Sequence, residues 1–62
     1  MSPVEYLTQR RVQAAQTLIR TGDLPLAEIA RQTGFASPGY FSTVFRRCVG
    51  MTPGDYRRRM GS

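Results

Sequence analysis

The chain has 62 residues and a net charge of +5, with one cysteine and no histidine. A chain this short forms one small domain or a fragment of one, and it can hold neither an internal disulfide nor a cysteine–histidine metal cluster. No apolar run approaches the roughly 20 residues that cross a bilayer. All nine basic residues are arginine. We therefore expect an anionic partner, most often nucleic acid, with a basic surface that only keeps the domain soluble as the alternative.

Cellular location and catalysis can be addressed from the same composition. A lone cysteine suits a reducing intracellular setting, and no basic start with an apolar middle marks a signal peptide, so we expect a cytoplasmic protein. With no histidine and four scattered acidic residues, no catalytic set is visible. We expect neither enzymatic activity nor a metal or other cofactor.

Three positions share one sequence form, a hydroxyl residue followed by proline: Ser2-Pro3, Ser37-Pro38 and Thr52-Pro53. A hydroxyl side chain at an N-cap accepts a hydrogen bond from an unpaired amide, and proline needs no N–H at the first helical position. Glu5 after Ser2 has the capping-box spacing, and Asp55 after Thr52 approximates it. Each of the three positions therefore predicts a helix start.

The first helix is predicted over residues 3–20, with Gly22 as a left-handed cap. Apolar side chains recur on one of its faces at helical spacing: Val4, Leu7, Val12, Ala15, Leu18 and Ile19. Arg11 falls inside this stripe. We expect it to pair with Glu28 or Asp55, because an unpaired charge near a core is costly. The alternatives are that its head reaches solvent or a phosphate.

The second helix is predicted over about residues 25–32, with Leu26, Ile29 and Ala30 on its buried face. Proline at position 25 offers no side-chain cap, so Asp23 is the expected substitute. Gly34 ends this helix.

The third helix is predicted over about residues 38–48, and the last over 52–59. Phe41, Val44, Phe45 and Cys48 make an apolar stripe on the third helix, so we interpret Cys48 as a small core residue. Tyr56 is expected to dock the last helix on the core. No alternating run suggests a strand, and the predicted fold class is all-α, a small four-helix domain.

Residues 24–48 have the spacing of a helix-turn-helix, with the turn at residues 33–37. Ala30 lets the two helices approach closely, and Gly34 permits the positive φ of the turn. Phe35 can plug the wedge between them. This spacing alone is a moderate signal, because many helical hairpins that bind nothing share it. Residues 1–2 and 60–62 carry no expected role.

A longer pattern is more specific: "EYLTQRRVQAAQTLI" followed by "LPLAEIARQTGFASPGYFSTVFRRCVGMTPGDYR". It resembles the DNA-binding region of the AraC/XylS family of bacterial transcription regulators over residues 3–57. The resemblance implies a homeodomain-like fold with a linker helix at 3–20 and the second of two helix-turn-helix units. It places the first unit, and any effector or dimerisation domain, outside this chain.

The resemblance also implies double-stranded DNA as the partner, with the helix at 38–48 at the major groove. The face opposite the apolar stripe would carry the contacts, with Arg31 reaching a phosphate from the preceding helix. The expected DNA-binding residues are Ser37, Gly39, Ser42, Thr43, Arg46, Arg47 and Arg31. Arginine can bond guanine or clamp phosphate, and hydroxyls can bond either. Arg10, Arg20 and the run 57–59 are expected to be solvated surface.

This sequence departs from the family pattern where relatives often carry longer polar side chains, at Pro38, Gly39 and Thr43. Our hypothesis is that the unit supplies mainly affinity and positioning, with modest base reading by Thr43 and Arg46. The amides of Gly39 and Tyr40 are expected near a phosphate. The alternative function is a protein-interaction module that contacts RNA polymerase or another regulator domain. A membrane-surface helix is a weaker alternative, because the first helix needs its apolar stripe for the core.

Overall fold

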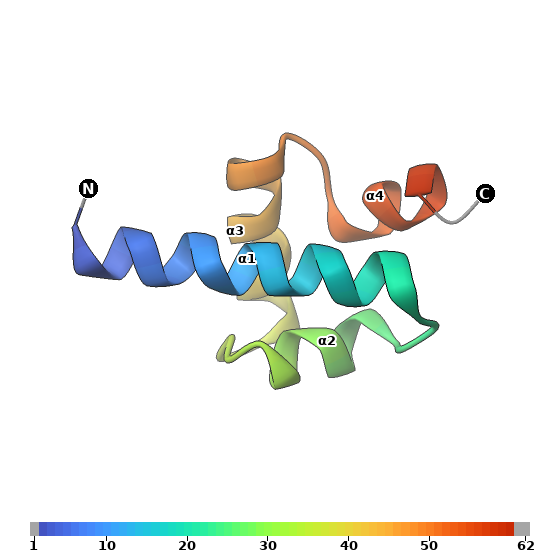
Figure 1. Ribbon diagram of the computed structural model, residues 1–62, viewed down its shortest axis with the longest axis horizontal. Helices are drawn as coiled ribbons and strands as arrows, with labels where there is room; N and C mark the ends of the chain where they lie inside the picture. The colour runs from blue at the N-terminus through green and yellow to red at the C-terminus, as the bar shows by residue number, and fades with distance from the viewer. Residues whose placement is uncertain (1, 61–62) are drawn as a thin grey trace.

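The computed structural model describes residues 2–60, which form four helices and no strand. The helices are α1 (Pro3–Thr21), α2 (Leu26–Gln32), α3 (Pro38–Val49) and α4 (Pro53–Met60). In Figure 1, α1 runs along the long axis and α3 crosses behind it, with α2 and α4 on opposite sides of α1. The predicted all-α, four-helix class is confirmed.

The helix starts show the predicted caps. Ser2 Oγ accepts from the amide of Glu5 at 3.1 Å, and the Ser2 amide donates to the Glu5 carboxylate at 3.4 Å, which completes a capping box. Thr52 Oγ1 accepts from the amide of Asp55 at 3.2 Å. The Asp55 carboxylate does not return to its N-cap; it pairs with Arg58 one turn along α4.

Two predicted caps around the α1–α2 connection are wrong. Gly22 follows α1 with a φ of −158°, which is extended backbone and needs no glycine. Asp23 does not cap α2, because the N-cap position is Pro25 and no side chain bonds the first amides. The connection is instead held from outside, by a hydrogen bond from the Arg57 guanidinium to the carbonyl of Leu24.

Aromatic rings form the centre of the core. Phe35 lies 5.0 Å from Phe41, Phe41 lies 5.6 Å from Phe45, and Phe45 lies 5.5 Å from Tyr56, measured between ring centroids. The tilted and edge-on geometries are those that aromatic pairs prefer. This chain of rings joins the turn before α3 to α4, so it fixes α3 from both ends.

The apolar stripe of α1 is buried only in its later turns. Val12, Ala15 and Ile19 are buried, whereas Val4 is 73% exposed and Leu7 is 48% exposed. The prediction that Val4 and Leu7 join the core is wrong, because the first turns of α1 extend past α2 and α3 (Figure 1). Helical periodicity identifies a face but not how far the packing partners reach along it.

Cys48 is also exposed, so its interpretation as a core residue is wrong. It lies on the last turn of α3, at a surface groove that it lines with Gln9, Val12 and Gln13 of α1. The buried residues of α3 are therefore Phe41, Val44 and Phe45, without Cys48.

Arg11 does not form the predicted ion pair. The carboxylate of Glu28 bonds Arg31, and that of Asp55 bonds Arg58. Half-buried Arg11 instead lies over the turn glycine: its Nε would sit 3.1 Å from a Cβ built at Gly34. Gly34 has a φ of +93°, the left-handed conformation predicted for this turn.

Two arginines that were expected to be solvated have structural partners. Arg20 donates from Nη1 to the Tyr56 hydroxyl at 2.7 Å, and Arg57 donates to Leu24 as described above. Both bonds tie α4 to the far end of α1 and to the loop that follows it. Within residues 2–60, none of the helices is both long and apolar enough to cross a bilayer.

Candidate nucleic-acid interface

The helix-turn-helix is built from α2, a tight turn and α3. The amide of Gly34 donates to the Arg31 carbonyl at 3.2 Å and that of Phe35 donates to the Ala30 carbonyl at 3.0 Å, so the turn closes directly on the end of α2. Ala30 is 1% exposed and Phe35 is 7% exposed. The small residue and the plugging ring thus lie where the sequence predicted them, between the two helices.

α3 has one buried face and one open face. Phe41, Val44 and Phe45 are buried and turned into the protein. All seven predicted DNA-binding residues are exposed: Ser37, Gly39, Ser42, Thr43, Arg46, Arg47 and Arg31. Helical periodicity explains this separation, because residues three and four apart share a face.

Four of these residues line one shallow groove of about 430 Å³, together with a residue that the sequence prediction missed. The lining residues are Ser42, Thr43, Arg46, Arg47 and Thr52. Thr52 caps α4, and the short connection after α3 brings it back beside the last turns of that helix. The pair Thr52-Pro53 predicted a helix start. The place of Thr52 in the groove depends on how the chain turns back after α3, which the sequence did not reveal.

The groove is positively charged. Among the described residues, the side chains of Arg46 and Arg47 have no carboxylate partner and no hydrogen bond. Their guanidinium groups keep all their N–H donors for a partner, in the fork geometry that matches phosphate and the guanine edge. Arg47 also borders a second groove, between α1 and α3, so it lies at the edge of the open face.

The start of α3 is partly occupied by its own cap. Ser37 Oγ accepts from the amide of Tyr40 at 3.1 Å, so the prediction that the Tyr40 amide is open to a phosphate is wrong. A Cβ built at Gly39 meets nothing within 4 Å. Gly39 therefore offers a bare stretch of helix surface that a partner can approach closely.

Thr43 is less free than its exposure suggests. Its hydroxyl donates to the Gly39 carbonyl one turn back, at 3.1 Å. The oxygen retains acceptor capacity, which suits a donor such as a base amino group. Base reading by Thr43 as a donor requires this intrahelical bond to break.

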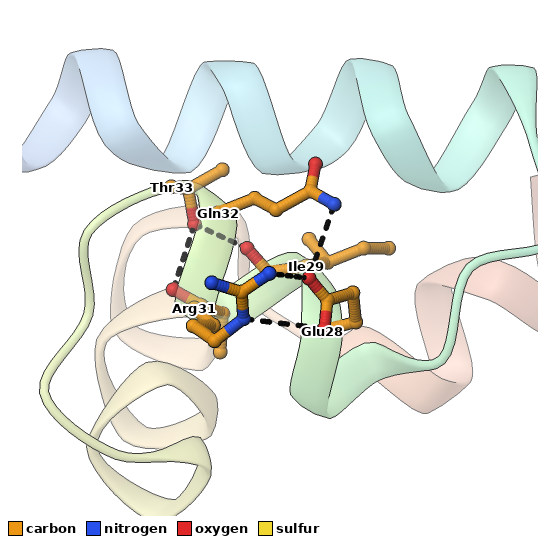
Figure 2. Close-up of polar contacts among 6 residues, drawn as sticks. Glu28, Ile29, Arg31, Gln32 and Thr33 are labelled. Carbon is orange, nitrogen blue, oxygen red and sulfur yellow. Dashed lines mark hydrogen bonds and ion pairs between the residues drawn. The ribbon is translucent and has the colours of Figure 1, made fainter.

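Arg31 stands apart from the groove, on α2. Its Nε donates to Glu28 Oε1 at 3.2 Å and its Nη2 pairs with Oε2, which also accepts from Gln32 Nε2 at 3.1 Å (Figure 2). The hydrogen bond from Arg31 is the main reason that the pKa of Glu28 lies below its ordinary value, and the bond from Gln32 adds to this effect. The bond with Glu28 and the carboxylate charge raise the pKa of Arg31. The pair is locally neutral.

The arrangement presents hydroxyls and unpaired guanidinium groups on a convex helix, with a rigid aromatic core behind them. Such a surface can bond phosphate oxygens and base edges, as a helix-turn-helix does in a DNA groove. Within residues 2–60, no group of three or more His, Cys, Asp or Glu side chains is placed to hold a metal ion.

Comparisons with known proteins define the class of this fold and site. A family model described as a helix-turn-helix domain matches residues 1–59. The structure of a DNA-binding transcriptional dual regulator from Escherichia coli K-12 superposes with a TM-score of 0.92 at 36% identity, covering 98% of this chain and 55% of that one. The C-terminal domain of the response regulator yesN from Fusobacterium nucleatum gives 0.89 at 38% identity, covering 92% and 55%. The protein is a helix-turn-helix DNA-binding domain.

Curated relatives narrow the family. A putative AraC-like transcription regulator of Streptomyces antibioticus is 45% identical over 56 residues, which are 90% of this chain and 18% of the relative. The transcriptional activator RhaR of Yersinia pseudotuberculosis is 46% identical over 59 residues, 95% of this chain and 20% of the relative. The chain thus spans about a fifth of the length of these relatives. It belongs to the AraC-type helix-turn-helix family, whose domains bind DNA sequence-specifically in transcription regulators.

Proposed function

We propose that this domain binds duplex DNA by laying the open face of α3 in the major groove, as one DNA-binding unit of a longer transcription regulator. The observation that carries the proposal is the groove over α3, where two arginine side chains without a protein partner lie beside three hydroxyl residues. Family membership supports DNA as the ligand of that groove.

The residues of α3, its cap Ser37 and the groove residue Thr52 have distinct proposed roles. Arg46 and Arg47 contact phosphates or guanine, and the hydroxyls of Ser42 and Thr52 form hydrogen bonds with neighbouring phosphate oxygens of the DNA. Ser37 caps the start of α3, and the absence of a side chain at Gly39 lets a DNA strand come close to the backbone of α3. Because Thr43 is held by an intrahelical bond, base reading here is modest, and the unit contributes mainly affinity and register.

The domain organisation is also a proposal. α1 would act as a linker-type helix that joins this unit to a preceding helix-turn-helix unit of the longer protein. The exposed side chains of Val4, Tyr6 and Leu7 on its first turns support this, because they offer apolar surface that the four-helix core leaves open. Effector and dimerisation domains would lie in the rest of the longer chain. Since the proposed partner is bacterial DNA, we propose a cytoplasmic location.

Contact with RNA polymerase is a secondary candidate for the whole regulator. It is supported only by the relative RhaR, which is a transcriptional activator. No enzymatic step is part of the proposal. A gel shift with competitor DNA separates a DNA-binding domain from a purely protein-binding one.

The test of the proposal is a fluorescence-anisotropy titration of the chain against a labelled duplex, in a series of salt concentrations. We expect a dissociation constant of roughly 10⁻⁴ to 10⁻⁶ M and a slope of log affinity against log salt of about −3 to −4, since each neutralised phosphate contributes about −0.9. R46A is expected to weaken binding and to make the slope shallower by about 0.9. R10A removes the same charge from exposed α1 and serves as the control. Equal binding by R46A and the unmodified chain overturns the role of α3.

A further inference from the structure

Arg31 differs from the other arginines of the interface in being matched by an acid on its own helix. Glu28 lies one turn before it and receives its Nε and Nη2 donors, while Gln32 donates to the same carboxylate (Figure 2). Both carboxylate oxygens are therefore engaged. Arg46 and Arg47 have no such acid among the described residues.

The pair lies on the outside of α2. Ile29 and Ala30 turn into the core at 0% and 1% exposure, whereas the Arg31 side chain is 73% exposed and that of Glu28 is 32% exposed. In a helix-turn-helix complex the first helix crosses the DNA backbone. A charge on the outer surface of α2 is then within the screening length of about 10 Å from phosphates.

We propose that Glu28 restrains the sequence-independent DNA affinity of this domain by neutralising Arg31 on the surface of α2. This inference rests on the proposed function. A neutral pair displaces few counterions from DNA, and the carboxylate itself repels phosphate. Phosphates are the same in every sequence, so an acid at this position lowers binding to all duplexes and leaves the groove over α3 to supply a larger share of the affinity.

A change at Glu28 should alter how the affinity for DNA depends on salt. E28Q frees the guanidinium of Arg31, and the slope of log affinity against log salt should become steeper by up to about 0.9. Between 50 and 200 mM salt, a slope change of that size corresponds to a roughly threefold larger loss of affinity. Binding to every duplex should tighten at low salt.

The experiment compares E28Q, R31Q and the double variant with the unmodified chain, each titrated by fluorescence anisotropy against one labelled duplex at several salt concentrations. D23N is the matched control, because Asp23 is an exposed acid with no ion pair or hydrogen bond to another described residue. It adds the same charge as E28Q at a site away from the pair. Circular dichroism melts confirm that each variant is folded.

We expect E28Q to steepen the slope more than D23N does, and R31Q to remove that gain in the double variant. Slopes for E28Q and D23N that agree within error would overturn the inference, because only net charge would then matter. A gain that survives in E28Q/R31Q overturns it as well, because Arg31 would not be the group released. Absence of DNA binding by the unmodified chain overturns the proposed function together with this inference, whereas binding with an unchanged E28Q slope overturns this inference alone.

Discussion

The Arg11 guanidinium lies across the turn of the helix-turn-helix, with Nε 3.1 Å from where a Cβ of residue 34 would stand. Two independent requirements therefore meet at Gly34: a φ of +93° and the absence of a side chain under Arg11. The sequence predicted the first requirement from turn chemistry. The second depends on how α1 crosses the turn, which no local pattern encodes.

G34A is accordingly expected to destabilise the domain by roughly 1–2 kcal/mol, from the left-handed backbone alone. The loss should be measured as a lower free energy of unfolding in urea. G39A is the control, because residue 39 lies in the first turn of α3 and a Cβ there meets nothing within 4 Å. Equal stability of G34A and G39A would contradict this account of the turn.

The same control variant tests the approach of DNA to α3. Since the protein leaves open space at Gly39, G39A should keep or raise the free energy of unfolding, by up to about 1 kcal/mol. Its affinity for duplex DNA should nevertheless fall, because the added methyl group stands where the partner is proposed to come close. Unchanged anisotropy titrations would show that no strand approaches this turn.

The caps of α1 and α3 are expected to differ in their contribution to global stability. S37A removes the oxygen that accepts from the Tyr40 amide, and should lower the free energy of unfolding by about 1 kcal/mol. S2A breaks a similar cap, but the first turns of α1 pack against little, as the exposure of Val4 indicates. Hydrogen exchange should therefore show only local fraying in S2A. A global loss in S2A as large as in S37A would contradict that view of α1.

The ion pair on α2 has a signature in the titration of Glu28. Because Arg31 lowers the pKa of this carboxyl, R31Q should raise it toward the ordinary value, as followed by the side-chain carbon shift in NMR. A lowered folded pKa stabilises the fold above the unfolded pKa, and that stabilisation disappears as the pH falls through the folded value. In R31Q the free energy of unfolding should therefore decrease less as the pH falls. An unchanged Glu28 titration in R31Q would mean that the pair does not persist in solution.

Local chemistry made much of the fold predictable. A serine or threonine followed by proline identified three helix starts. The spacing of Phe41, Val44 and Phe45 identified the buried side of α3. These features work within one or two helical turns. The exposed side of α3, and with it the candidate groove, followed directly from that spacing.

Features set by contacts between distant helices were not predictable. Val4 and Leu7 have the correct period but stay largely exposed, and Val4 only borders the groove between α1 and α3. The partners of Arg11, Arg20 and Arg57 depend on how α1, α4 and the loop before α2 meet. Thr52 entered the groove for the same reason, through the return of the chain after α3.

The most direct test of the central claim is an amide-shift titration of the isotope-labelled chain with a short DNA duplex. We expect the largest changes at residues 39–47 and at Thr52, with the amides at the start of α1 unchanged. Changes concentrated at the start of α1 or along α4, with residues 42–47 unaffected, would contradict the claim.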